Sequence, residues 1–166
     1  NTNAGTGINI YKDSLILEKL NKLYQTNSKI KKIKKYLVSI DECVYSKNVN
    51  DRFLNKNECH ETIENQYISL LSIDDFMNAS LDPNCTNAKD RSCTNFNYLY
   101  ESSHKSEWTV VPALSDTSKV LIFSGSVFSE YVANNAKSVY PVITLSKYAF
   151  YKEGTGTKED PYVIRY

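Results

Sequence analysis

The sequence predicts an α+β domain in which an N-terminal amphipathic helix precedes a mixed, mostly antiparallel sheet with disulfide-stapled loops. Apolar side chains follow a helical period near the N-terminus. The last third, from Trp108 to Tyr166, consists of short aromatic and β-branched runs bounded by Gly, Pro, Ser and Asn, which is typical of an antiparallel meander. The four cysteines form an even set without a C-x-x-C pair, a pattern that favours disulfides.

Length and charge limit the class of the protein. The 166 residues suit one domain, and 20 basic against 19 acidic residues give a net charge of +1, so no global field steers the chain onto nucleic acid. No apolar run approaches the roughly 20 residues that span a bilayer. We expect residues 1–9 to be a linker or trimmed end and residues 10–166 to form a single extracellular domain. The membrane is expected to be reached only through an N-terminal anchor that has been removed.

The helix is predicted over Tyr11–Gln25, where Asp13 or Ser14 can cap its start. Its apolar face contains Leu15, Ile16, Leu20, Leu23 and Tyr24. A lysine-rich run from Lys29 to Lys35 follows, and Tyr36–Ile40 is predicted to be a strand. Such a run suits an anionic wall polymer, a lipid surface or nucleic acid. We interpret it instead as a solvated face whose aliphatic stems cover neighbouring apolar groups.

The middle of the chain is more irregular. Polar residues 48–64 predict a loop or a short helix, and Tyr67–Ile73 predicts a strand. We expect a helical turn over Asp74–Ala79 that begins at Asp74, with Asp74 and Asp75 acting as cap and dipole partners rather than as a catalytic pair. Residues Leu81–Asn97 have the composition of a loop.

The remaining elements are strands and turns. Strand-like runs are Trp108–Pro112, Lys119–Phe123, Ser124–Phe128 and Val139–Leu145. The segment Gly154–Lys158 lacks the spacing of a phosphate-binding loop, and we interpret it as a turn between two edge strands.

The cysteines are predicted to form two disulfides, Cys43 with Cys59 and Cys85 with Cys93, because both pairs close short local loops. Disulfides imply an oxidising location. Two metal alternatives stay open. Zinc would use the cysteines with His60 and His104, and calcium would use oxygen ligands from the second cysteine loop, namely Asp82, Asn84, Asn87 and Asp90. Neither shows the spacing of an established metal motif, so we expect no metal and no cofactor.

No catalytic constellation is present in the sequence. The chain has two histidines and no G-x-S-x-G elbow, and a pair of carboxylates proves little among 19 acids. We therefore expect no enzyme. An extracellular hydrolase remains the weakest alternative.

The 13 tyrosines are the compositional feature that best suits a binding function, although sheets also favour tyrosine. The candidate ligand contacts are Tyr98, Tyr100, Trp108 and Tyr131. Trp108 opens a predicted strand, so we interpret it first as a core anchor.

Several motifs in order carry a family resemblance: Tyr67–Ala79, Asn97–Leu99, Trp108–Pro112, Ser124–Val127, Val139–Leu145 and Gly154–Ile164. Together they cover about 100 residues and resemble the C-terminal ectodomain of surface proteins from low-GC Gram-positive bacteria, many of which carry a pilin-type leader. The ending also resembles the C-type-lectin-like fold of formylglycine-generating enzymes. Two positions depart from the family pattern. Tyr140 stands where the family has Arg, and Gly154-Thr-Gly-Thr157 stands where a G-D-G-T turn is usual.

The resemblance implies a C-type-lectin-like sheet and a non-enzymatic subunit anchored at the cell surface. The catalytic cysteines of the formylglycine-generating enzymes have no matching motif here, so their activity is not implied. The expected partners are copies of the chain or other surface or pilus subunits, and no nucleic acid. The alternative is a receptor or lectin-like domain that binds glycan or host protein through its loops and tyrosines.

Overall fold

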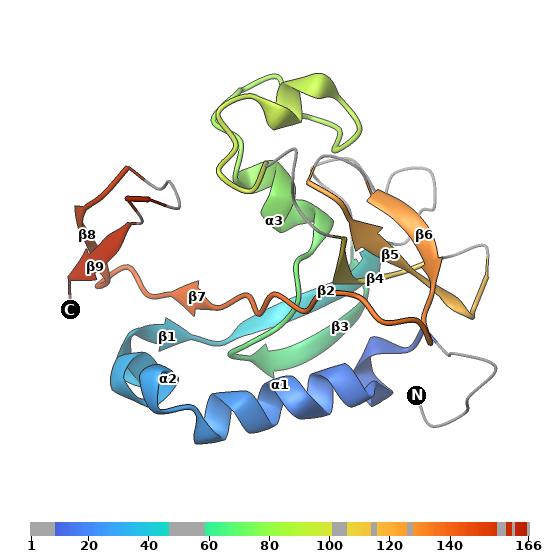
Figure 1. The fold of residues 1–166 in the computed structure, drawn as a ribbon, viewed down its shortest axis with the longest axis horizontal. Helices are drawn as coiled ribbons and strands as arrows, with labels where there is room; N and C mark the ends of the chain where they lie inside the picture. Colours follow the sequence, from blue (N-terminus) through green and yellow to red (C-terminus); the bar gives the residue numbers. More distant parts are fainter. Residues whose placement is uncertain are drawn as a thin grey trace.

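The computed structural model describes residues 9–46, 59–100, 106–113, 116–125, 128–155, 159–160 and 162–165, without the side chains of residues 45, 46, 59, 60, 164 and 165. These residues form an α+β fold whose strand pairs are antiparallel, as predicted (Figure 1). The expected sheet is divided, however. Within the described ranges, the strands form four small sheets: β1–β7, β2–β3, β4–β5–β6 and β8–β9.

The N-terminal helix is confirmed. A 3-10 turn, η1 (Tyr11–Asp13), leads into α1 (Leu15–Thr26), and the Oγ atom of Ser14 accepts a hydrogen bond from the Leu17 N–H at 3.1 Å. Ser14 rather than Asp13 is therefore the cap. The lysine-rich run, predicted without a regular element, forms α2 (Ser28–Ile33) and the 3-10 turn η2 (Lys34–Tyr36). Asn27 caps α2 by accepting hydrogen bonds from two backbone N–H groups.

The predicted strand over 36–40 is divided between β1 (Leu37–Val38) and β2 (Ile40–Ser46). The prediction of a loop or helix over 48–64 is wrong from residue 59 onward, because β3 (Cys59–Gln66) pairs antiparallel with β2. Residues 47–58 lie outside the described residues. The polar composition of β3 misled the prediction, since only Ile63 of its described side chains is buried.

Residues 67–72, predicted to be a strand, contribute only isolated bridges, from Ser69 to Val142 and from Leu71 to Thr109. Helix α3 (Ile73–Asn78) begins one residue earlier than predicted. Its cap is Ser72, whose Oγ accepts from the Asp75 N–H at 3.0 Å, while the Asp75 carboxylate accepts from the Ser72 N–H at 2.9 Å. The prediction that Asp74 begins and caps the turn is therefore wrong, because Ser72 is the cap and forms a capping box with Asp75, while Asp74 and Asp75 both lie in the first turn of α3.

The three-stranded meander β4 (Glu107–Pro112), β5 (Lys119–Phe123) and β6 (Phe128–Val132) matches the prediction for β4 and β5. Of the predicted strand Ser124–Phe128, Ser124 and Gly125 are not in a strand and β6 begins at Phe128, while residues 126 and 127 lie outside the described residues. In Val139–Leu145, only β7 (Thr144–Leu145) is regular. The C-terminal hairpin of β8 (Phe150–Glu153) and β9 (Val163–Arg165) confirms two paired strands on either side of the segment Gly154–Lys158, of which residues 156–158 lie outside the described residues.

The core joins α1, α3 and the two larger sheets. Leu17 and Leu20 of α1 belong to one buried cluster with Phe76 of α3 and Phe123 of β5. The ring centroids of Phe76 and Phe123 are 4.9 Å apart. In Figure 1 the β2–β3 hairpin lies between α1 and α3, and the loop that follows α3 lies at the opposite end of the molecule from α1.

Candidate binding surface and buried acidic site

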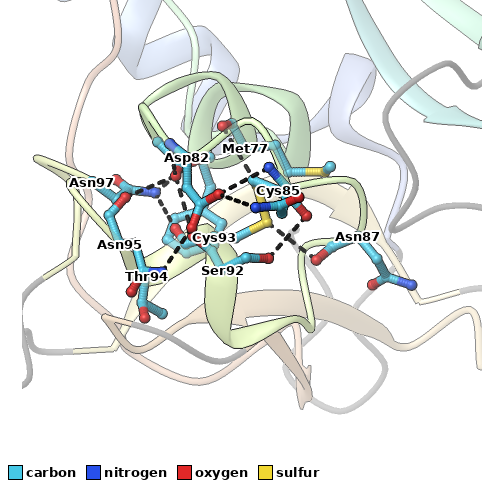
Figure 2. Close-up of a disulfide and its surroundings, with 12 residues drawn as sticks. Met77, Asp82, Cys85, Asn87, Ser92, Cys93, Thr94, Asn95 and Asn97 are labelled. Atoms are coloured by element: carbon cyan, nitrogen blue, oxygen red, sulfur yellow. Dashed lines mark hydrogen bonds between the residues drawn. A yellow bond between two sulfur atoms is a disulfide. The ribbon is translucent and has the colours of Figure 1, made fainter.

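The loop from Leu81 to Asn97, here called the disulfide loop, is held by one covalent link and a polar network (Figure 2). Cys85 is bonded to Cys93, as predicted, and both sulfurs are buried. The Asp82 carboxylate accepts hydrogen bonds from the Asn95 side chain at 2.7 Å and from the Asn84 backbone at 2.9 Å. These bonds hold the pKa of Asp82 below its usual value. The loop is therefore ordered by these polar bonds together with Cys85, Ala88 and Cys93, which belong to the buried core cluster.

Phe96 is the most unusual residue of this loop. Its backbone φ is 49°, in the left-handed region that bulky side chains avoid, and its side chain is 80% exposed. Both neighbours are fixed. The carbonyl oxygen of Asn95 accepts from Ser80 Oγ at 2.8 Å, and Asn97 Nδ2 donates to the carbonyls of Phe76 at 2.8 Å and Cys93 at 2.7 Å. The surrounding bonds thus impose a strained backbone that presents an aromatic ring to solvent.

Other large side chains of the segment are exposed with Phe96. Leu81 is 80% exposed, Tyr98 69% and Tyr100 41%. Tyr98 and Tyr100, two of the predicted ligand contacts, are therefore accessible. A single exposed apolar group is ordinary, but several on one ordered loop are typical of a contact surface.

The C-terminal hairpin is a second group of exposed rings. Every side chain of β8 is exposed, including Phe150 and Tyr151. The ring of Tyr151 lies edge-on to that of Tyr162 with centroids 5.5 Å apart, and its hydroxyl donates to the Gly154 carbonyl at 2.6 Å. Gly154 has a φ of 103°, a conformation that glycine adopts without steric cost.

Tyr98 connects the two groups. Burial raises the pKa of its hydroxyl, and the charge of Asp75 and the neighbouring Tyr162 add to the effect. Tyr162 precedes β9, so Tyr98, the residue directly after the disulfide loop, lies within electrostatic reach of the hairpin. We call Phe96, Tyr98, Tyr151 and Tyr162 the aromatic surface.

The other two predicted ligand contacts lie elsewhere. Trp108 is in the core at 5% exposure, as its interpretation as a core anchor expects, and Tyr131 is 36% exposed on β6. Their rings are 6.4 Å apart, and the Lys137 ammonium lies 3.9 Å from the centroid of the Tyr131 ring. The structure therefore does not bring the four residues together, and their role in binding stays a prediction.

The cysteines limit the metal alternatives. Cys43, Cys85 and Cys93 are disulfide-bonded, so the zinc alternative is wrong for these three sulfurs. The predicted pairing of Cys43 with Cys59, and the side chains of His60 and His104, lie outside the described residues. Of the proposed calcium ligands, Asp82 and Asn87 accept hydrogen bonds within the loop itself. Among the described residues, no group of three His, Cys, Asp or Glu side chains could hold a metal ion.

Glu42, a residue of β2, forms a buried acidic site. Glu42 is 3% exposed, and its Oε2 atom has no hydrogen-bond partner. Burial, followed by the charge of Asp75, raises its pKa from the usual 4.5 to about 7, although a hydrogen bond from Ser69 opposes the rise. Burial and the Glu42 charge also raise the pKa of Tyr11. An acid with such a pKa can donate or accept a proton near neutrality.

Two cavities lie beside Tyr11, but neither is lined by Glu42. The larger has a volume of about 200 Å³ and lies between η1 and the ends of β2 and β4, with Lys12, Val44 and Pro112 in its wall. Because the acid does not face either cavity, a substrate there could not exchange a proton with it directly.

Sequence reasoning missed Phe96, the hairpin rings and Glu42. Phe96 stands between two asparagines just after Cys93, which is a turn composition around an aromatic residue. Glu42 stands two residues before Val44 and therefore on the same face of its strand, which could have indicated its burial. The hairpin rings gave no distinct signal, since aromatic residues are frequent in buried strands as well.

Comparison of the chain with protein-family models, with curated proteins and with solved structures found no match. Among the described residues, no helix is both long and apolar enough to cross a membrane.

Proposed function

We propose that this chain is a non-enzymatic, C-type-lectin-like surface domain of a Gram-positive bacterium that acts as a pilin-like structural or adhesive subunit. The observation that carries the proposal is Phe96, whose ring is 80% exposed on a backbone held in the left-handed region. An exposed ring gains little burial energy within the domain, and the left-handed backbone costs about 1–2 kcal/mol. A contact outside the domain would offset that cost.

The remaining aromatic surface supports the same function. Tyr98, Tyr151 and Tyr162 are each more than half exposed. Tyrosine provides large contact area and a hydroxyl for hydrogen bonds, which is why it is frequent at the centre of protein interfaces. The Cys85–Cys93 disulfide supports a location outside the cytosol, where such bonds persist.

Sedimentation velocity of the purified chain over a range of concentrations tests the subunit function. We expect concentration-dependent association that is lost in Phe96→Gly/Tyr162→Ser and kept in Val139→Ser. Val139 is 44% exposed but lies outside the disulfide loop and the hairpin. A chain that stays monomeric at every concentration, alone and with other subunits from the same surface, would contradict the proposal.

The second candidate is a receptor that binds glycan or host protein through the same surface. The exposed rings of Tyr98 and Tyr100, together with the polar groups of the disulfide loop before them, favour it, because sugars stack on aromatic faces and accept polar contacts at their edges. Saturable binding on a glycan array that disappears in Tyr98→Ser, without self-association, would replace the first function by the second. An array without any saturable ligand would exclude a glycan receptor.

A further inference from the structure

The N-terminal helices form a surface of a different kind. Residues 12–35 contain eight lysines, no arginine and only two acids, Asp13 and Glu18, although the whole chain has a net charge of only +1. The rest of the chain is therefore net acidic. Each of the eight lysines is exposed: Lys12, Lys19, Lys22, Lys29, Lys31, Lys32, Lys34 and Lys35. We call this group the basic surface.

The basic surface is not neutralised within the domain. In the part of the chain that the structure describes, none of its lysines forms a salt bridge. Two of them lie over rings instead. Lys34 Nζ is 4.5 Å from the centroid of the Tyr24 ring and Lys35 Nζ is 4.8 Å from that of Tyr36. A cation over a ring keeps its full charge, so the surface potential of this region is strongly positive.

The supporting helices are firmly attached. Leu17 and Leu20 place the inner side of α1 in the core, and the Tyr24 ring is stacked on Tyr67 with centroids 5.0 Å apart. Asn27 caps α2 directly after α1 ends. Lys19 and Lys22 are consequently presented by a helix that is fixed in the core, so little backbone conformational entropy would be lost when they meet an opposite charge.

Apolar side chains stand among these charges. Ile10 is 47% exposed and Leu15 is 50% exposed. Leu15 shares the outer side of α1 with Lys19 and Lys22, because positions i, i+4 and i+7 of a helix lie on one face. A soluble polyanion would not bury the apolar side chains of Ile10 and Leu15, whereas a lipid surface accepts both cations and shallow apolar contacts.

We propose that the basic surface binds the anionic headgroups of a lipid bilayer, with Ile10 and Leu15 entering the interfacial region. Lysine suits this partner because it acts as a mobile point charge without the fixed fork geometry of arginine. The disulfide loop lies at the opposite end of the molecule from α1, so it would face away from the bilayer (Figure 1).

Vesicle flotation tests the proposal with the complete chain. Vesicles of phosphatidylcholine alone are compared with vesicles that also contain phosphatidylglycerol, at about 0.1 M and about 1 M salt. We expect binding only to the anionic vesicles and only at low salt. Lys29→Glu/Lys31→Glu/Lys32→Glu should reduce the bound fraction by about tenfold or more. The variant Lys19→Glu/Lys22→Glu tests α1 in the same way.

The matched control is Lys137→Glu/Lys147→Glu/Lys152→Glu, which makes the same change of charge outside the basic surface. It should change binding much less than the α2 variant. Phe96→Gly should leave vesicle binding unchanged, which separates this proposal from that on the aromatic surface. Absent binding of the wild-type chain to anionic vesicles at low salt, or equal losses in both triple variants, would overturn it.

Soluble polyphosphate distinguishes a membrane from an anionic polymer. Leu15→Ser should weaken binding to anionic vesicles and leave any binding to polyphosphate unchanged. If polyphosphate binds and the vesicles do not, or if Leu15→Ser has no effect on vesicle binding, the partner is an anionic polymer and the membrane proposal is wrong.

Discussion

Aromatic residues have different environments in two regions of the molecule. Between α3 and the meander β4–β6 their rings are buried, whereas in the disulfide loop and the C-terminal hairpin they are exposed. Phe76 and Phe123 are 0% and 1% exposed and touch each other in the core, whereas Phe96 and Phe150 are 80% and 63% exposed. Burying a phenylalanine stabilises a fold by about 1.5–3 kcal/mol, and an exposed one contributes almost nothing. The first group therefore stabilises the fold, and the second is available for contacts outside it.

The means by which the two regions are ordered differ as well. The meander is held by strand pairing and apolar contacts, while the disulfide loop is held by a covalent link and side-chain hydrogen bonds to the backbone. Rings that are not needed for order can be placed in solvent. We therefore expect mutations of the buried rings to lower stability, and mutations of the exposed rings to change binding with little effect on stability.

Phe76→Ala should have the largest effect. Removing a fully buried ring that contacts Phe123 and Phe128 leaves a cavity, and we expect the free energy of unfolding to fall by about 3–5 kcal/mol. Urea denaturation measures the change. Phe150→Ala is the matched control and should change the stability by less than about 0.5 kcal/mol. Equal losses in the two variants would remove the distinction between the regions.

Cys85→Ala/Cys93→Ala should lower the free energy of unfolding by about 3 kcal/mol, because the disulfide closes a short loop in the unfolded chain. The double variant is preferred to reduction of the wild-type chain, because reduction would also open the disulfide of Cys43. Limited proteolysis should then cut first between residues 81 and 97 while the meander stays protected. Simultaneous loss of both regions would show that the disulfide loop supports the core.

Glu42→Gln tests whether the buried carboxyl group of Glu42 has a raised pKa. The raised pKa means that the folded chain holds a proton between pH 4.5 and about 7 that the unfolded chain has released, so stability falls as pH rises through this window. The neutral Gln side chain avoids that loss.

We expect Glu42→Gln to be more stable than the wild type by up to about 3 kcal/mol near pH 8 and nearly equal to it below about pH 4.5. Urea denaturation at the two pH values measures the difference. Glu18→Gln removes a charge from an exposed side chain and is the control. A stability gap that does not change with pH would contradict the raised pKa.

Phe96→Gly should have the smallest effect on stability, and a gain rather than the losses expected for Phe76→Ala and for the cysteine variant. Glycine adopts the left-handed conformation without steric cost, so the free energy of unfolding should rise by about 1 kcal/mol. Phe96→Ala keeps the β-carbon and should show little of this gain. A loss of stability in Phe96→Gly would mean that the ring supports the loop instead of a contact outside it.

Much of the fold could be predicted because local patterns decide it. The helical period fixed α1, and the short apolar runs fixed β4 and β5, since each pattern requires burial of one face. Strand β3 could not be predicted because its stability comes from pairing with β2, and little of its own side-chain pattern is apolar. The division of the sheet depends on long-range pairing, such as Leu37 with Leu145, that no local pattern encodes.

The candidate surface could be predicted only in part. Tyr98 follows from the tyrosine content of a loop, but its proximity to Tyr162 depends on how the C-terminal hairpin folds back. The exposure of Phe96 requires knowledge of a backbone angle that composition does not determine. The lysine-rich run was evident, yet its partial helical structure was not predicted, although Ile30 and Ile33 stand three residues apart, a spacing that suits one face of a helix.

The hydrogen bonds of Asn97 determine how a mechanical load on Phe96 would enter the domain. A pull on that ring passes through Asn97 to the Phe76 carbonyl of α3 and so to the most buried part of the core. The Cys85–Cys93 bond also bridges a sequence separation of 8 with a Cα–Cα distance of 4.5 Å, which removes roughly 22 Å of possible extension. A partner under tension would thus pull on an almost inextensible attachment.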